Sequence, residues 1–151
     1  IVGEQRETPY IIDNGDTYAI LPGGKLDNAD STIYPYSAVV QLVGEPKIKE
    51  SGNIEYPIYG SGYMVGPNTV VTAAHCLVKD HEWLDKIRVY YKSHGNYESA
   101  EYSYAIKGFC FSGYFEDTNG NDWAVLKTEN PIGNITGWFG FALTNNTMIN
   151  K

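Results

Sequence analysis

The stretch SGYMVGPNTVVTAAHC (residues 61–76) joins two strand-like runs through a tight turn and ends on a histidine followed at once by a cysteine. Pro67 presets its own φ and Asn68 tolerates a left-handed backbone, so the stretch predicts a β-hairpin. His75 follows the second run and two small alanines, which leaves room for a substrate beside the imidazole. The stretch therefore predicts a β fold and offers His75 as a candidate general base.

Six short runs rich in β-branched and aromatic residues, separated by turn residues, continue this pattern along the chain. They are residues 36–44, 59–66, 68–76, 85–93, 102–111 and 122–128. In the fourth run Ile87, Val89 and Tyr91 occupy alternate positions, as expected of a half-buried strand. This even spacing predicts an all-β domain with little helix, built as a small antiparallel barrel or sandwich.

Composition excludes several classes of function. The 151 residues carry a net charge of −7, and no basic stripe is present to neutralise phosphates, so we expect no nucleic-acid partner. No apolar run is long enough to span a bilayer, so we expect no membrane partner. Cys76, Cys110 and the histidines His75, His81 and His94 do not have the spacing of a metal site. We expect neither a metal nor a cofactor.

Residues 1–33 differ from the rest of the chain because they mix Gly, Pro, Asp and Asn with only short apolar pairs. Such a composition is typical of an arm or loop. The chain begins at Ile1, without an initiator methionine or a signal segment, which suggests a processed or trimmed product.

Asp122 is the second residue with candidate chemistry. It opens the run at residues 122–128, and the bulky Trp123 beside it would exclude water. A carboxylate in such a position can hold a histidine in one tautomer and stabilise its charged form. Taken singly, His75 also fits an ordinary surface histidine, and Asp122 fits an ordinary turn residue.

Three segments together resemble one family: residues 61–76, NDWAVLKTENPIGNITGWFGF (residues 121–141) and STIYPYSAVVQL (residues 31–42). They are similar to the N-terminal half of the glutamyl endopeptidases, V8-like secreted bacterial serine proteases with the chymotrypsin double-barrel fold. The resemblance covers residues 19–151 and implies an all-β, antiparallel Greek-key barrel, the first of two. It leaves residues 1–18 as a propeptide remnant or N-terminal arm.

The resemblance also implies the chemistry. His75 would be the general base and Asp122 its orienting acid in a His, Asp, Ser triad. The nucleophile of this family lies in a Gly-x-Ser-Gly motif of the second barrel, and no such motif follows Asp122 in this sequence. Ser61, in YGSGYM, corresponds to a strand of the first barrel instead. We therefore expect this chain alone to be inactive, because the serine and the oxyanion donors are absent.

The parent protein implied by this resemblance is a secreted, bacterial serine endopeptidase that cleaves polypeptides after Glu or Asp. Its missing C-terminal barrel would be present in cis or as the second chain of a nicked protease. Two other expectations remain open. The chain is an isolated half, or it is a non-catalytic chymotrypsin-like barrel that serves as a binding or scaffold module.

The cysteines depart from the family pattern. Relatives with a disulfide here carry a cysteine at the position of Gly60, paired with the one after the histidine. Cys76 is then either joined to Cys110 or a free thiol. An even pair in a secreted protein is more often bonded, but the sequence does not decide between the two states.

The start, IVG, is similar to the activated terminus of trypsin-like enzymes, yet it lies too far before His75 for that role. The resemblance places the mature start after Tyr18 instead, so we expect cleavage of a zymogen there.

A last candidate, DTNGND (residues 117–122), has the alternating oxygen ligands of a calcium loop. It lacks the distal glutamate of an EF-hand, which favours a simple turn.

Overall fold

The computed structural model describes residues 2–6, 30–46, 56–92, 100–116 and 121–141. Their elements, in chain order, are β1 (Val2–Arg6), η1 (Tyr36–Ala38), β2 (Val39–Glu45), β3 (Ile58–Gly66), β4 (Thr69–Thr72), η2 (Ala74–Cys76), β5 (Val78–Lys79), β6 (Glu82–Trp83), β7 (Lys86–Tyr91), β8 (Glu101–Phe111), α1 (Gly113–Glu116), β9 (Ala124–Thr128) and α2 (Gly133–Thr136). Among these residues no helix is long and apolar enough to cross a membrane.

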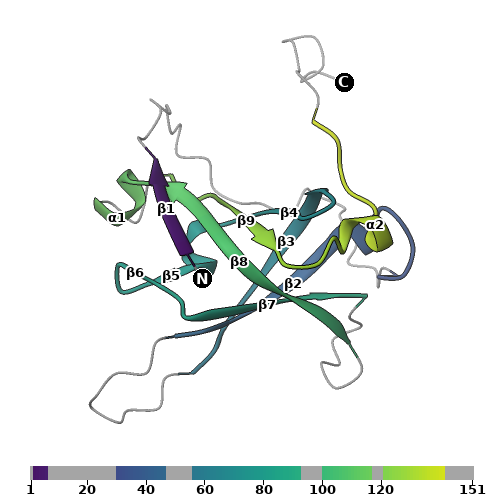
Figure 1. The fold of residues 1–151 in the computed structure, drawn as a ribbon, viewed down its shortest axis with the longest axis horizontal. Coiled ribbons are helices and arrows are strands. Elements are labelled where there is room, and N and C mark those ends of the chain that lie inside the picture. Colours follow the sequence, from purple (N-terminus) through teal and green to yellow (C-terminus); the bar gives the residue numbers. More distant parts are fainter. Residues whose placement is uncertain (1, 7–29, 47–55, 93–99, 117–120, 142–151) are drawn as a thin grey trace, which may run out of the picture.

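Six strands form a closed antiparallel barrel. The order of strands in the sheet is β8-β7-β2-β3-β4-β9, and pairing of β9 with β8 closes the ring (Figure 1). After β4 the chain crosses over and returns as β7 beside β2, which is a Greek-key connection. The prediction of an all-β antiparallel barrel is confirmed, and all six runs identified in the sequence contain a strand of it.

Alternation of apolar residues explains why these segments form strands around one core. Leu42, Val70, Val89 and Leu126 come from four different strands, and each is at most 2% exposed. Met64 of β3 and Leu77, just beyond η2, are fully buried in the same cluster. The core therefore fills the interior of the barrel, and catalytic or binding groups are left to its rim and outer face.

The predicted hairpin is present, but the backbone conformation of its turn differs from the prediction. β3 and β4 pair up to Gly66↔Thr69, with Pro67 and Asn68 between them. The prediction of a left-handed Asn68 is wrong, since Asn68 is not among the residues with positive φ. Instead its Nδ2 donates to the carbonyl oxygen of Thr128 at 3.1 Å, and its own carbonyl accepts from the Thr128 N–H at 3.0 Å. The turn is thus tied to the end of β9.

Another strand was not expected from the sequence. Residues 2–6, which read as arm or loop, form β1, which pairs in parallel with β8 from Val2↔Lys107 to Arg6↔Phe111. Figure 1 shows β1 alongside the C-terminal half of β8. Residues 7–18 of the predicted arm lie outside the described residues.

A second small sheet follows η2. Strands β5 and β6 form a hairpin whose two turn residues, Asp80 and His81, both have positive φ (51° and 63°). Positive φ at both central residues is the geometry of a type I′ turn, which matches the twist of the flanking strands. Trp83 of β6 packs against Phe115 of α1, with ring centroids 5.9 Å apart. The β5–β6 hairpin, which follows His75 in the chain, therefore packs against α1, which follows β8.

Cys76 and Cys110 are both buried free thiols, so the structure contains no bridge between them. The backbone of Gly60 lies directly against Cys76. A Cβ built at Gly60 would clash with the Cys76 Sγ and lie 3.1 Å from the Cys76 Cβ. Glycine is therefore the residue that leaves room for an unbonded thiol at Cys76.

Burial also changes the acidity of both thiols. It raises the pKa of Cys110 to about 11. The pKa of Cys76 is raised as well, chiefly by burial, although a hydrogen bond with Thr72 opposes the shift. Because the thiolate is the reactive form, both cysteines should be inert in the folded protein at neutral pH.

We predict that Gly60→Cys forms a disulfide with Cys76. The Cβ atoms would lie 3.1 Å apart, somewhat closer than the usual range of about 3.5–4.5 Å, so β3 must shift by a few tenths of an ångström. Closing this short loop contributes on the order of 3 kcal/mol in the chain-entropy model. Thiol counting after denaturation should find one free thiol, that of Cys110.

Gly60→Ser is the matched control, because serine has nearly the size of cysteine and cannot bond. It should keep two thiols and lose about 1–3 kcal/mol of stability through overpacking. Three reactive thiols in oxidised Gly60→Cys would contradict the placement of Gly60 against Cys76.

Alkaline stability provides a further prediction. Since the folded pKa of Cys110 is raised from 9.0 to about 11, the unfolded chain loses this proton first as the pH rises. The free energy of unfolding should therefore fall between pH 9 and pH 11. Urea unfolding across this range should show that the free energy of unfolding falls less with pH in Cys110→Ala than in the unsubstituted chain. An equal loss in both would exclude Cys110 as a source of the effect.

Candidate active site

His75 lies at the rim of the barrel, in the short helix η2 that follows β4. The apolar neighbours Ala74 and Cys76 are buried and fix the turn in the core, whereas the His75 side chain is 60% exposed. The sequence placed His75 at the end of a strand, and the structure agrees. An imidazole on a firmly anchored turn can face a substrate without losing its position.

Asp122 contacts His75 through both of its carboxylate oxygens. The His75 Nδ1 lies 2.6 Å from Oδ2 of Asp122, and the backbone N–H of His75 donates to Oδ1 at 2.9 Å. An ionised carboxylate only accepts hydrogen bonds, so the proton in the first contact belongs to Nδ1. This tautomer leaves the lone pair of Nε2 available to take a proton from another group.

Strand register brings the two residues together. Thr72 of β4 pairs with Ala124 of β9. His75 follows Thr72 closely in the chain and Asp122 precedes Ala124 closely, so this pairing brings both residues to the same point of the barrel rim. Cys110 of β8 pairs with the same Ala124 from the other side. The separation of His75 and Asp122 is therefore set by the pairing of β4 with β9, while the pairing with β8 fixes the other edge of β9.

A tight turn at Asn121 directs Asp122 toward the histidine. Asn121 has a φ of 57°, and its carbonyl oxygen accepts the N–H of Trp123 at 2.8 Å. The left-handed region is strained for most residues and least so for Gly, Asn and Asp. Among the described residues none hydrogen-bonds to the buried Oδ1 of Asn121. Asn121 thus contributes through its backbone conformation. This role was not predicted, although an asparagine directly before Asp122 was the available signal in the sequence.

A pocket of about 370 Å³ opens beside Asp122. Its wall combines residues of β2, β3 and β4 with exposed apolar side chains, among them Val39, Tyr63 and Trp123. Ser61 also lines it as a residue of β3, and its carbonyl accepts a hydrogen bond from Thr72 Oγ1 at 2.7 Å. The structure thus places Ser61 in a strand of the barrel, as the resemblance implied.

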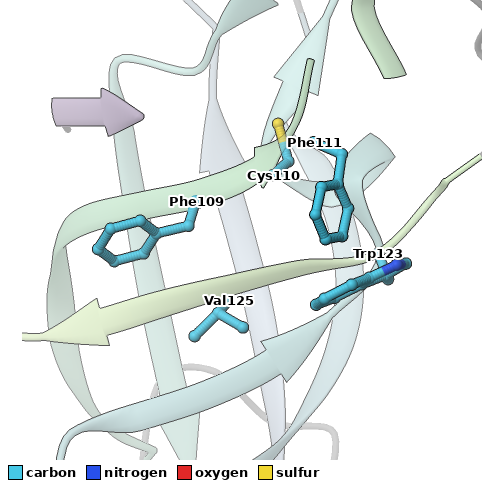
Figure 2. Close-up of a pocket in the computed structure, with 5 residues that line it drawn as sticks. All are labelled: Phe109, Cys110, Phe111, Trp123 and Val125. Atoms are coloured by element: carbon cyan, nitrogen blue, oxygen red, sulfur yellow. The ribbon is translucent and has the colours of Figure 1, made fainter. Parts of the chain in front are cut away.

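An apolar pocket of about 390 Å³ lies across the outer face of β8 and β9. Figure 2 shows Phe109 at one end and Phe111 with Trp123 at the other, and Val125 lies between them on β9. The rings of Phe111 and Trp123 meet edge to face, with centroids 4.4 Å apart. This pocket and the one beside Asp122 share Trp123.

Cross-strand pairs join these pockets into one outer apolar row. Directly paired residues project from the same face of a sheet, and the pairs here follow one another around five strands. The outer apolar row consists of Val39, Tyr63, Val71, Val125 and Phe109. It passes beside the His75–Asp122 pair and is partly exposed, since Val39 is 48% and Tyr63 is 42% exposed.

The remaining candidates for chemistry do not converge. Within the described part of the chain no three His, Cys, Asp or Glu side chains are grouped to hold a metal ion. His81 is at the tip of the β5–β6 hairpin. Residues 117–120 of the candidate calcium loop, and His94, lie outside the described residues.

We predict that Asn121→Ala is less stable than Asn121→Gly by about 1 kcal/mol, because only the alanine is strained at a φ of 57°. Urea unfolding measures this difference. The strain should also disturb the Asp122 carboxylate, so the NMR signal of the His75 Nδ1 proton should weaken in the alanine variant alone. Equal stability and equal spectra would show that the turn does not depend on this conformation.

Comparison with known proteins agrees with this geometry. Residues 24–148 match the trypsin family. An extracellular metalloprotease of Bacillus subtilis (strain 168) is 36% identical over 79% of this chain and 37% of its own length. A glutamyl endopeptidase of Bacillus licheniformis is 27% identical over 80% of this chain and 35% of its own length. The chain thus spans about a third of the length of these relatives.

Solved structures show the same fold. A Glu endopeptidase determined in complex with MPD has a TM-score of 0.59 at 21% identity, over 78% of this chain and 51% of that one. HL collagenase has a TM-score of 0.56 at 19% identity, over 82% of this chain and 48% of that one.

The word metalloprotease in the name of one relative has no counterpart in the described residues, where His75 and Asp122 provide two donors without a third. The matched family, the Greek-key barrel and the paired His75 and Asp122 agree: the chain belongs to the trypsin family, and it is similar to the V8-like glutamyl endopeptidases.

Proposed function

We propose that this chain is the N-terminal barrel of a serine endopeptidase in which His75 is the general base and Asp122 its orienting acid. The observation that carries the proposal is the 2.6 Å contact between His75 Nδ1 and Asp122 Oδ2. The contact fixes the tautomer that a base needs, and the exposed ring presents Nε2 to solvent.

In the proposed reaction a serine hydroxyl of the parent protein attacks the carbonyl carbon of a peptide bond. His75 Nε2 takes the hydroxyl proton as the C–O bond forms, and later gives it to the leaving amine as the C–N bond breaks. Asp122 stays ionised and stabilises the imidazolium between these steps. The serine and the oxyanion donors come from outside residues 1–151, so this chain by itself should not hydrolyse peptides.

Cleavage after Glu or Asp is the finer part of the proposal. It is supported by the resemblance to glutamyl endopeptidases and by the relative of that name. Among the described residues, no basic side chain lines the pocket beside Asp122. We propose that the positive group that recognises an acidic substrate residue lies in the rest of the parent protein.

The outer apolar row supports a second barrel as the partner of this one. Relatives are almost three times as long as the matched segment, and the row with its two pockets is an apolar surface beside the candidate site. A contiguous exposed apolar surface beside a functional site commonly marks an interface. We propose that the C-terminal barrel covers it, in cis or as a nicked second chain, and supplies the serine there.

Secretion follows from the same relationship, because one relative is named as extracellular. In this setting residues 1–18 would be the end of a propeptide, removed near Tyr18 to convert a zymogen into the mature enzyme. N-terminal sequencing of active, secreted protein should begin at Ala19. Recovery of Ile1 as the terminus of fully active material would overturn this maturation step.

We predict that His75→Ala or Asp122→Asn in the full-length parent lowers turnover by about 10⁴-fold on a Glu-containing reporter peptide. Both side chains lie at the rim and are partly exposed, so the melting temperature should change little. The reason is chemical: the first change removes the base, and the second allows the wrong tautomer.

Ser61→Ala is the control in the same assay. Ser61 is an exposed residue of β3, so its loss should leave turnover within a few-fold of the parent protein. Unchanged turnover in both His75→Ala and Asp122→Asn would refute the catalytic assignment. It would leave the alternative, a non-catalytic barrel that serves as a binding or scaffold module.

A further inference from the structure

The pairing of β8 differs along its length. This strand has eleven residues, and its first part pairs with β7 from Tyr91↔Glu101 to Arg88↔Tyr104. Beyond Tyr104 no residue of β7 pairs with it. Its second part pairs with β9 as far as Cys110↔Ala124, on the opposite edge. Among the described strands, β7 and β9 therefore leave one edge of β8, from Lys107 to Phe111, to another partner.

The N-terminal strand β1 borders this edge. Its five residues pair with β8 from Val2↔Lys107 to Arg6↔Phe111. It is the one parallel strand among the described pairings, and it contributes nothing to closure, which β8 and β9 achieve without it. Main-chain pairing of an extended segment with a sheet edge is a recurring mode of peptide recognition.

The edge also lies close to the candidate catalytic pair. Cys110, within the segment that β1 borders, pairs with Ala124, which follows Asp122 by two residues. The next residue, Phe111, packs its ring against Trp123. When β1 is bound, this part of β8 is paired with both β1 and β9. When β1 is absent, it is paired with β9 alone.

We propose that the edge of β8 between Lys107 and Phe111 is a strand-acceptor site for an extended peptide in parallel register, and that residues 2–6 are its tethered occupant. Binding is reversible and uses backbone hydrogen bonds. Cutting the chain between this segment and the barrel turns the occupant into a separate ligand. The proposed maturation near Tyr18 would be one such cut, but the acceptor site itself rests on the pairing register and not on protease function.

The tether sets the scale of the affinity. A covalent connection between a ligand and its site acts as an effective concentration on the order of millimolar. The strand is formed in the intact chain, so the separate peptide should bind with a dissociation constant of about a millimolar or tighter. Such binding can be measured by titration.

The experiment begins with the full chain carrying an inserted recognition sequence for a specific protease between Tyr18 and Ala19. Hydrogen exchange is measured before and after the cut, with the released fragment washed away. We expect the amides of Lys107–Phe111 to exchange faster after the cut, while those of the β3–β4 hairpin remain unchanged. Equal exchange at Lys107–Phe111 in both states would overturn the proposal.

The synthetic peptide IVGEQRET, residues 1–8, is then titrated into the cut and washed protein and followed by NMR. Saturable shifts confined to β8 and its immediate neighbours are expected, with no such response in the uncut chain, whose site is already occupied. Absence of saturable shifts up to several millimolar would overturn the proposal.

Two N-methylated peptides provide a matched pair. In a parallel strand one residue directs its N–H and C=O toward the neighbouring strand, and the next residue directs them away. Methylation of the backbone nitrogen at Glu4 or at Gln5 should therefore weaken binding about tenfold in one case and hardly at all in the other. Equal effects of the two would contradict an in-register strand. No step of this test measures proteolysis, so a failed triad assignment would leave it intact.

Discussion

Pairing on both edges of β9 is the constraint on which the rest of this structure depends. On one edge Ala124 meets Thr72 of β4, and on the other it meets Cys110 of β8. The first pairing sets the distance between Asp122 and His75, and the second closes the barrel. The geometry of the candidate site is consequently a property of sheet register first, and the turn at Asn121 and the buried neighbours of His75 then direct the two side chains toward one another.

Much of this arrangement could be predicted from the sequence because its determinants are local. Alternating apolar residues in six runs identify the barrel strands, and the motifs around His75 and Asp122 identify the family. Asn68 shows the limit of local reasoning, since its side chain bonds to Thr128 instead of relaxing a left-handed turn. The partner of that bond is distant in the sequence and has no signature near Pro67.

The segment β1 was beyond prediction for a related reason. Val2–Arg6 has no apolar alternation, and its strand conformation depends on pairing with β8, which is distant in the sequence. The cysteines were equally undetermined, because the choice between bridge and thiol depends on the space beside Gly60. In both cases the deciding partner is a backbone brought near by the fold.

The order in which the chain is synthesised gives the β4–β9 pairing another meaning. Strands β2, β3 and β4 can pair as soon as they emerge, but β4 must wait for Ala124–Thr128 before its second edge is satisfied. Contacts between distant segments are slow to form because the intervening chain must first be ordered. Pairing of β4 with β9 is therefore a late event in folding, and His75 meets Asp122 only when it occurs. A chain in which these two strands have not yet paired lacks the His75–Asp122 contact.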